Sequence, residues 1–323
     1  MTDAGRTLRV DVMTPERAPR IAVGPDRVEA VERAVTSGGG VPCGITDNPE
    51  AVIWTAGPDT FPATLPESVK WVQLPAARVD EWLSEGIVRA HPLVLWTSAA
   101  GAYSATVAEH ALMLLLAGVR GLPQHLAQTS WVPAALAPAV GTLRGSTVGI
   151  IGVGGVGRAL IPMLSSLGAH TLAVSRSGRP VPGAVETFPA ERIDEIWPRA
   201  NHFVLTAPID PGLEELIGTA EFAAMKPETW VVNVAHGRLV DTDALVSALR
   251  SGSIAGAGLD VTRPEPLPDG HPLWSLPNAM ITPHDSNPRA LRIPAYLEHI
   301  TDNVTRFVTG VDPLPRIDPS AGY

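Results

Sequence analysis

Short apolar runs and helical periodicities alternate along the first hundred residues. The runs at 51–54 (AVIW), 69–74 (VKWVQL) and 93–96 (LVLW) predict buried strands. Between residues 28 and 35, valine and alanine recur with the spacing of one helix face. This alternation of strands and helices is typical of an α/β domain.

The same alternation continues after a long apolar helix predicted at about 104–118 and a loop rich in Pro and Ala at 121–141. Further strands are expected within the segments 146–178, 202–208, 231–241, 255–261 and 278–286. The chain therefore contains enough strand and helix units for a second α/β domain.

One of these segments, VVNVAHGRLVD (231–241), carries polar side chains where a strand ends. Its valines predict a buried strand, followed by a turn at His236 and Gly237 and a helix from near Asp241 to Gly252. Functional side chains in α/β proteins lie where strands end and helices begin. His236 and the nearby Arg238 are therefore candidate functional residues.

Residues 146–178 read as strand, glycine turn, helix and strand, with the pattern G-x-G-x-x-G at Gly152, Gly154 and Gly157. The first glycine permits a tight turn, the second lets the backbone approach a pyrophosphate, and the third lets the helix pack close to the strand. The pattern predicts a dinucleotide site, with a ligand-free glycine turn as the alternative. Pro162 is expected to kink the helix or loosen its first turns.

The end of the second strand bears on the choice of cofactor. NAD sites usually place a carboxylate there for the ribose 2′-hydroxyl. Here the position is Ser175, followed by Arg176, Ser177 and Arg179, without Asp or Glu. An arginine can bind a 2′-phosphate that a carboxylate would repel, so we expect NADP(H) to be favoured over NAD(H). The alternative is a solvated arginine beside a permissive site.

Composition narrows the class of protein. Apolar residues make up 45% of 323 residues, enough for a substantial core, and the net charge is −9 with no cluster of Lys and Arg. We therefore expect no nucleic-acid or membrane partner. The longest apolar run, 111–119, is too short to span a bilayer, and the N-terminus lacks a signal-peptide core. A soluble, cytoplasmic protein is expected.

Two further expectations concern cysteine and metal. The single cysteine, Cys43, excludes an intrachain disulfide. The histidines are scattered without the spacing of paired ligands, so no metal site is predicted.

Several stretches in a fixed order resemble the D-isomer-specific 2-hydroxyacid dehydrogenases, in particular the glyoxylate/hydroxypyruvate reductase-like branch. They are YSATVAEHALMLLLAG, GTLRGSTVGIIGVGGVGRAL, LTAPIDPGLEELIG, GLDVTRPEPLPDGHPLW and ITPHDS. The resemblance implies two Rossmann-like, doubly wound parallel-sheet domains with a cleft between them. The substrate domain would comprise 1–98 and 287–323, and the dinucleotide-binding domain 99–286.

The resemblance also implies a dimer and a C-terminal helix that packs back onto the first domain. A homodimer through the cofactor domain is expected from the family alone. In the C-terminal helix, apolar residues on one stripe would pack back onto the first domain: Leu297, Ile300, Val304, Phe307 and Val308.

The resemblance further implies a small 2-oxoacid or 2-hydroxyacid substrate and a set of site residues. His284 matches the acid/base histidine, Glu265 its paired acid, and Asp260 a carboxylate near the nicotinamide ribose. Imidazole suits proton transfer at the C2 oxygen during hydride transfer. The alternatives are that His284 is a structural histidine and that Glu265 is a surface acid. His271 is expected to be structural. The remaining implied cofactor contacts are Thr106, Gly155, Val156, Ala207, Pro208 and Val234.

Two positions depart from the family pattern. His236 stands where relatives carry the arginine that binds the substrate carboxylate, and imidazole does not reproduce a bidentate guanidinium. The substrate loop, expected to use Ala77, Arg78 and Val79, carries Arg78 where relatives have glycine. Either Arg78 or Arg238 could supply the missing cation.

Two functions therefore stay open at this point. One is an NADP(H)-dependent 2-oxoacid reductase with altered carboxylate recognition. The other is a dinucleotide-binding protein with little turnover, acting as a sensor or a partner subunit.

Overall fold

The computed structural model describes residues 17–77, 79–131, 140–208 and 211–318. It divides into two compact units, which we call the discontinuous unit (1–99 with 296–323) and the continuous unit (100–295). Helix α10 (Arg289–Val308) passes from the second to the first. The assignment of substrate and cofactor roles to these units stays a prediction.

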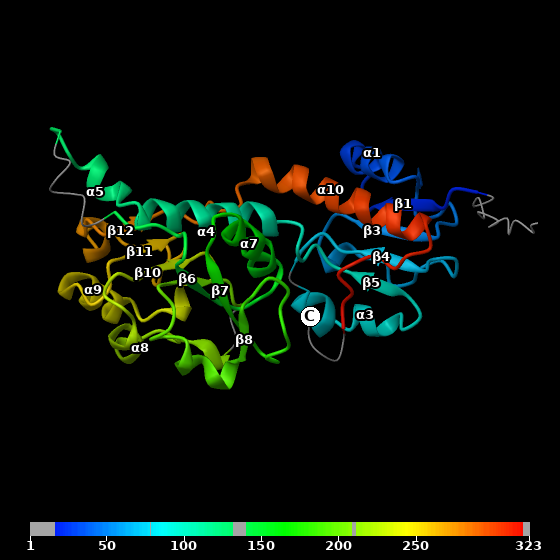
Figure 1. Ribbon diagram of the computed structural model, residues 1–323. Coiled ribbons are helices and arrows are strands. Elements are labelled where there is room, and N and C mark those ends of the chain that lie inside the picture. Colours follow the sequence, from blue (N-terminus) through cyan, green and yellow to red (C-terminus); the bar gives the residue numbers. More distant parts are fainter. Residues whose placement is uncertain (1–16, 78, 132–139, 209–210, 319–323) are drawn as a thin grey trace, which may run out of the picture. The chain divides into compact units, whose positions relative to one another are not determined.

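The discontinuous unit is built on a five-stranded parallel sheet in the order β2-β1-β3-β4-β5. Its strands are β1 (Arg20–Gly24), β2 (Val41–Cys43), β3 (Ala51–Trp54), β4 (Trp71–Gln73) and β5 (Leu95–Thr97). Its helices, besides the C-terminal part of α10, are α1 (Glu29–Ser37), α2 (Asp80–Ser84) and α3 (Ile87–Ala90). In Figure 1, α1 and α10 lie on one side of the sheet and α3 on the other.

Both faces of this sheet are buried, which explains the continuous apolar runs of its strands. Alternate residues of β1 point to opposite faces: Ile21 packs with α1 and α10, and Ala22 packs with α2 and α3. The predicted stripe of α10 packs on this core, with Ile300 and Val304 fully buried.

The continuous unit is built on a seven-stranded parallel sheet in the order β12-β11-β10-β9-β6-β7-β8. Its strands are β6 (Thr147–Ile151), β7 (His170–Ser175), β8 (Glu186–Pro189), β9 (His202–Leu205), β10 (Trp230–Asn233), β11 (Gly256–Leu259) and β12 (Ala279–Ile281). Its helices are α4 (Ser104–Val119), α5 (Leu122–Leu126), α7 (Gly155–Ser166), α8 (Thr219–Ala224), α9 (Thr242–Ser251) and the start of α10.

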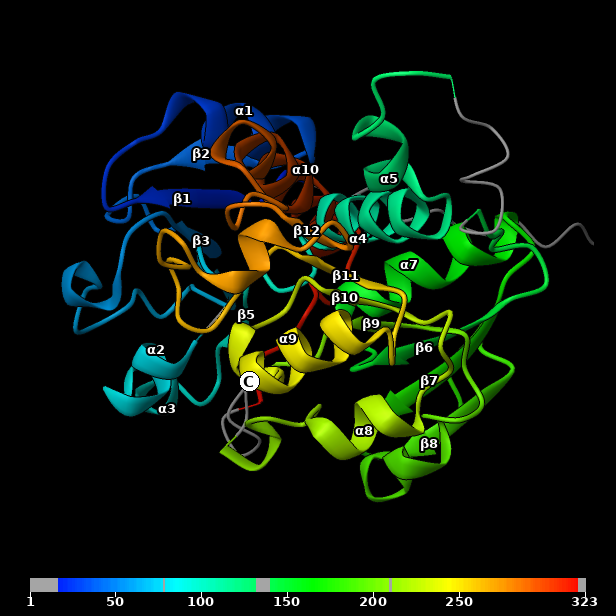
Figure 2. The ribbon, with the colours of Figure 1, turned by 90° about the vertical axis from the view of Figure 1, so that its left-hand side faces the viewer.

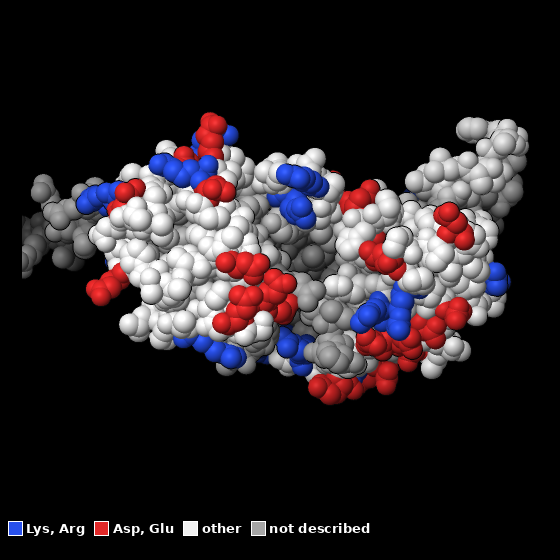
Figure 3. Space-filling view, turned by 180° about the vertical axis from the view of Figure 1, so that it is seen from behind, with Lys and Arg blue, Asp and Glu red and all other residues white. Residues whose placement is uncertain are grey.

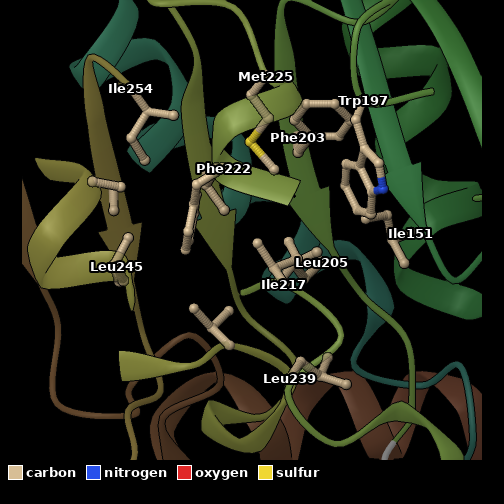
Figure 4. Packing of buried hydrophobic residues seen from close by; sticks show 14 of the residues in the cluster. Ile151, Trp197, Phe203, Leu205, Ile217, Phe222, Met225, Leu239, Leu245 and Ile254 are labelled. Carbon is tan, nitrogen blue, oxygen red and sulfur yellow. The ribbon is translucent and has the colours of Figure 1, made fainter. Parts of the chain in front are cut away.

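Helices cover both faces of this sheet as well, with α4 and α7 on one side and α8 and α9 on the other (Figures 1 and 2). Figure 4 shows the second side, where Phe222 of α8 lies between Leu245 of α9 and Leu205 of β9 in one buried cluster. Two parallel sheets, each covered on both faces, confirm the predicted doubly wound α/β class.

Residues at its own two ends determine where helix α9 begins and ends. The side chain of Asp241 accepts hydrogen bonds from the backbone N–H groups of Asp243 and Ala244, which caps the helix. Gly252 ends it with φ of 71°, a conformation that glycine adopts without steric cost.

The expected kink at Pro162 stays a prediction, although the helix itself is continuous. Helix α7 runs through Pro162 without interruption. Pro162 lies on the exposed side of the helix, where water can satisfy the carbonyl that loses its N–H partner.

Two surface properties can be stated for the part of the chain that the structure describes. No helix there combines the length and the apolarity needed to cross a bilayer. On the face shown in Figure 3, basic side chains lie in small groups scattered among acidic ones.

Candidate functional site

The predicted site residues of the continuous unit come together because its strands are parallel. They follow the carboxyl ends of six strands: Gly152 after β6, Ser175 at the end of β7, Ala207 after β9, His236 after β10, Glu265 after β11 and His284 after β12. Carboxyl ends of parallel strands share one edge of the sheet, and ligands of open α/β sheets bind there where the strand order reverses. Here the reversal lies between β6 and β9.

The glycine turn between β6 and α7 fits this position. Gly152 has φ of 90°, and a Cβ there would lie 2.3 Å from the Cα of Ala207, so the turn after β6 touches the segment after β9. A Cβ at Gly157 would lie 2.8 Å from the carbonyl oxygen of Gly152, which keeps α7 close to β6. A Cβ at Gly154 would meet no heavy atom within 4 Å.

The open space at Gly154 fits a dinucleotide pyrophosphate. It lies directly before the first turn of α7, where backbone N–H groups and the helix dipole favour an anion. Gly155 has a packing reason as well, because a Cβ there would lie 2.2 Å from the Oγ of Ser104 at the start of α4. Val156 follows in the first turn and is half-buried.

The turn after β7 presents exposed basic and hydroxyl groups. Ser175 is half-buried, and Arg176, Ser177 and Arg179 are exposed. The Nε of Arg179 donates to the Oγ of Ser177 at 3.2 Å. This turn offers hydrogen-bond donors and positive charge, as a ribose 2′-phosphate requires.

The structure brings His284 and Glu265 together across 19 residues of chain. The Nδ1 of His284 lies 2.6 Å from the Oε1 of Glu265, and their side chains are 63% and 42% exposed. An ionised carboxylate only accepts hydrogen bonds, so Nδ1 carries the proton of this bond. The other ring nitrogen, Nε2, remains for proton exchange with a bound molecule.

Asp260 anchors the turn that carries His284. Its Oδ1 accepts from the backbone N–H of Asp285 at 3.0 Å and from the hydroxyl of Thr282 at 2.7 Å, and its Oδ2 accepts from the N–H of Ser286 at 3.1 Å. Burial alone would raise the pKa of Asp260, but the hydrogen bonds from Thr282, Ser286 and Asp285 outweigh it and the pKa is lowered. Both oxygens thus have partners inside the turn, and the predicted contact with a nicotinamide ribose stays a prediction.

The turn at His236 is shaped by Asn233. The Nδ2 of Asn233 donates to the carbonyl oxygen of His236 at 2.8 Å, and its Oδ1 accepts from the N–H of Ala235 at 3.0 Å. A Cβ at Gly237 would lie 1.9 Å from the carbonyl oxygen of Thr262, so only glycine lets this turn pack on the loop before Glu265. His236 is half-buried at this contact between the two loops.

Arg238, the nearby candidate for the missing cation, has a partner on the surface. Its Nη1 lies 3.1 Å from Glu214 Oε1, with the two side chains 64% and 43% exposed. This pairing directs the guanidinium toward Glu214, which disfavours Arg238 as the residue that replaces the family arginine.

The remaining predicted cofactor contacts lie around the same edge of the sheet. Thr106, in the first turn of α4, donates from its hydroxyl to the carbonyl oxygen of Tyr103 at 2.9 Å. Ala207 and Val234 are buried, whereas Pro208 is exposed. Their backbone positions, directly after β9 and β10, are where a dinucleotide would approach the sheet.

The predicted substrate loop belongs to the discontinuous unit. Ala77 is exposed and Val79 is buried at the start of α2, while Arg78 lies outside the described residues. His271, which we expected to be structural, accepts the N–H of Leu273 through its Nδ1 at 3.3 Å. It thereby caps the short 3-10 helix Pro272–Ser275.

Sequence reasoning missed one histidine near this site. The Nε2 of His110, on α4, lies 2.9 Å from the Oγ1 of Thr282 and 3.5 Å from Asp260 Oδ1. Potential ligand atoms of His110, Asp260 and Asp285 lie within 4.8 Å of one another. Because hydrogen bonds already satisfy both oxygens of Asp260, this cluster needs no cation, and the absence of a metal stays a prediction.

Comparison with known proteins identifies the family. Residues 111–286, more than half of the chain, match the model of the D-isomer specific 2-hydroxyacid dehydrogenase, NAD binding domain. The chain belongs to this family. A 2-hydroxyacid dehydrogenase of this kind is an oxidoreductase that transfers hydride with a nicotinamide dinucleotide, which accounts for the glycine turn at the switch point.

Two relatives and one solved structure show what the chain is similar to. An uncharacterized protein of Corynebacterium melassecola is 40% identical over 80% of this chain and 85% of its own length. The human glyoxylate reductase/hydroxypyruvate reductase is 39% identical, over 55% of this chain and 56% of its own length. The structure of a D-isomer specific 2-hydroxyacid dehydrogenase from Xanthobacter autotrophicus Py2, in complex with NADPH and MES, matches with 26% identity and a TM-score of 0.69, covering 95% of this chain and 100% of its own.

Proposed function

We propose that this dehydrogenase is an NADP(H)-dependent reductase of small 2-oxoacids, with carboxylate recognition altered at His236. The observation that carries the proposal is the contact of 2.6 Å between His284 Nδ1 and Glu265 Oε1. A protein that only bound a dinucleotide would have no need of an imidazole held by a carboxylate. Reduction of a 2-oxoacid can use such a pair, because a proton must reach the C2 oxygen.

The chain's own residues then act as follows. A bound nicotinamide would supply the hydride for C2 of the oxoacid. His284, as imidazolium, donates the proton of Nε2 to the developing alkoxide, and Glu265 stabilises the imidazolium and holds its orientation. In the direction of oxidation the same Nε2 accepts the proton.

The preference for NADP(H) rests on the turn after β7. The solved structures that match include complexes with NADP and with NAD, so they leave the choice to local side chains. Ser175 takes the place of the carboxylate, and the exposed Arg176 and Arg179 follow. A 2′-phosphate gains charge-assisted hydrogen bonds from guanidinium groups, whereas a 2′-hydroxyl loses the acceptor it uses in NAD sites.

Recognition of the substrate carboxylate is the unusual part of the proposal. A carboxylate that leaves water needs a cationic or N–H partner. His236 is held in place by the turn of Asn233 and Gly237, but it offers at most a monodentate contact. We propose that Arg78 supplies the remaining positive charge. Glyoxylate and hydroxypyruvate, which appear in the name of the human relative, are the first substrates to test.

A homodimer through the continuous unit is also proposed. The support is three exposed apolar side chains that are close in sequence: Leu122 and Leu126 on α5, and Trp131, which is 94% exposed. Apolar surface of this kind is usually covered in an assembly.

The deciding experiment is oxidation of NADPH by the purified chain, followed at 340 nm with glyoxylate, hydroxypyruvate and bulkier 2-oxoacids. We expect turnover with at least one of them and its loss in His284→Gln. Tight binding of NADPH without turnover on the whole panel would instead support the dinucleotide-binding protein.

A further inference from the structure

The backbone of His284 adopts a conformation that the surrounding chain must impose. Its φ is 53°, in the left-handed region, which a residue with a Cβ rarely occupies. Residues persist there only when neighbouring interactions determine their conformation. The orientation of the imidazole therefore depends on whatever holds residues 282–286 in this turn.

Asp260 fixes this turn by accepting hydrogen bonds from three successive backbone N–H groups. Its carbonyl oxygen accepts from the N–H of His284 at 2.9 Å, and its carboxylate accepts from the N–H groups of Asp285 and Ser286. The carboxylate is fully buried, with none of its side chain exposed. A buried carboxylate keeps its charge and position only while its hydrogen-bond partners stay in place.

Thr282 and His110 extend this network, and the donor and acceptor of each hydrogen bond can be assigned. The hydroxyl of Thr282 has a single proton, and that proton goes to Asp260 Oδ1, which can only accept. The 2.9 Å contact between Thr282 Oγ1 and His110 therefore requires His110 Nε2 to donate. His110 is also well shielded, with 14% of its side chain exposed, so water does not easily replace it as the donor.

We propose that His110 is a positioning residue for His284, acting through Thr282 and Asp260. Helix α4 is a rigid support for it, since it packs along α7 and β10 in the core of the unit. His110 needs no contact with substrate or cofactor for this role. It orients Thr282, which keeps the Asp260 carboxylate aimed at the N–H groups of Asp285 and Ser286, directly after His284.

The first test measures the turn itself and needs no activity. Backbone amide exchange of a peptide covering 279–288 should be at least about fivefold faster in His110→Ala and in Thr282→Val than in the native chain. His110→Gln keeps an N–H donor at a similar distance and should restore slow exchange. His170→Ala, at an exposed histidine of the same unit, is the matched control and should leave this peptide unchanged.

The second test uses kinetics and rests on the proposed reductase activity. We expect kcat in His110→Ala to fall by roughly tenfold, because a displaced imidazole is misplaced for proton transfer, while the KM for NADPH changes less than about twofold. Thr282→Val should act alike, and the double variant should lose little more than either single one, since both remove one network.

Each outcome decides the proposal. Native-like exchange in both His110→Ala and Thr282→Val, or failure of His110→Gln to restore what His110→Ala loses, would overturn it. If the native chain proves inactive on every oxoacid, the reductase function fails while the exchange measurement still decides the role of His110.

Discussion

At the scale of single residues, we predict that Ser175 determines the preference between NADPH and NADH. With a hydroxyl in place of the carboxylate, and Arg176 beside it, NADPH should bind more tightly than NADH. Ser175→Asp should reverse that order, because a carboxylate accepts from a 2′-hydroxyl and repels a 2′-phosphate. Fluorescence titration of both cofactors measures this, with Ser177→Asp as the matched control. Equal affinities in the native chain would contradict the prediction.

Glu265 belongs to the same scale and predicts an effect on turnover. Its carboxylate lies 2.6 Å from Nδ1 of His284 and holds the imidazole in one orientation. Glu265→Gln should therefore lower kcat by roughly tenfold or more, because a misplaced imidazole is a poor proton donor, while the affinity for NADPH should not change. Steady-state kinetics and a titration with NADPH measure the two quantities. A kcat that stays at the native value would separate Glu265 from the proton transfer.

His236 and Arg78 form the third residue-scale prediction, on carboxylate recognition. If Arg78 supplies the missing charge, Arg78→Ala should raise the KM for a 2-oxoacid by roughly tenfold or more, as expected for one charge-assisted hydrogen bond. Binding of NADPH should not change. If the site is simply impaired, Arg78→Ala should do little, and His236→Arg should raise kcat/KM by orders of magnitude.

At the scale of an element, α5 predicts the interface of the proposed dimer. Leu122 and Leu126 are one helical turn apart on α5 and are 44% and 76% exposed, close in sequence to the exposed Trp131. Burying these side chains between two copies would stabilise a dimer, and a charge there would oppose it.

The corresponding variant is Leu126→Glu, which should convert the dimer to a monomer in light scattering after size-exclusion chromatography. Leu93→Glu is the control, because Leu93 is equally apolar and 96% exposed in the discontinuous unit. A dimer that survives Leu126→Glu would place the interface elsewhere, and a monomeric native chain would refute the homodimer.

At the scale of the whole molecule, His202 links folding to pH. It is 5% exposed at the start of β9, where its Nδ1 accepts the N–H of Trp230 at 3.2 Å. Burial lowers the pKa of His202 from 6.5 to about 4. The unfolded chain therefore binds a proton that the folded chain excludes, and the free energy of unfolding should decrease as pH falls from 6.5 to 4, by up to about 3 kcal/mol.

His202→Asn keeps an acceptor for Trp230 and removes the titration, so its loss of stability over this range of pH should be smaller. Urea unfolding, followed by tryptophan fluorescence at several pH values, measures the difference from the native chain. His170→Asn, at an exposed position, should follow the native curve. If His202→Asn also follows it, His202 has no part in acid sensitivity.

The sequence by itself determined the class of the fold and those elements that carry an apolar run, a glycine turn or a cap, because these signals depend on neighbours along the chain. It did not single out the strands β1, β2 and β8. Apolar runs predicted strands such as β3 at its observed bounds, the glycine pattern located the turn before α7, and the segment 231–241 contained its own strand, cap and helix start. The family motifs likewise marked His284 and Glu265, whose pairing the structure then showed.

The tertiary structure alone decided which distant groups meet. The contact between His110 and Thr282 spans 172 positions, and no spacing pattern can reveal it, since it depends on how α4 packs beside the edge of the sheet. The left-handed conformation of His284 and the close approach of Gly237 to Thr262 have the same origin. Parallel strands bring their carboxyl ends to one edge in an order set by crossovers, so the site exists only once the sheet has formed.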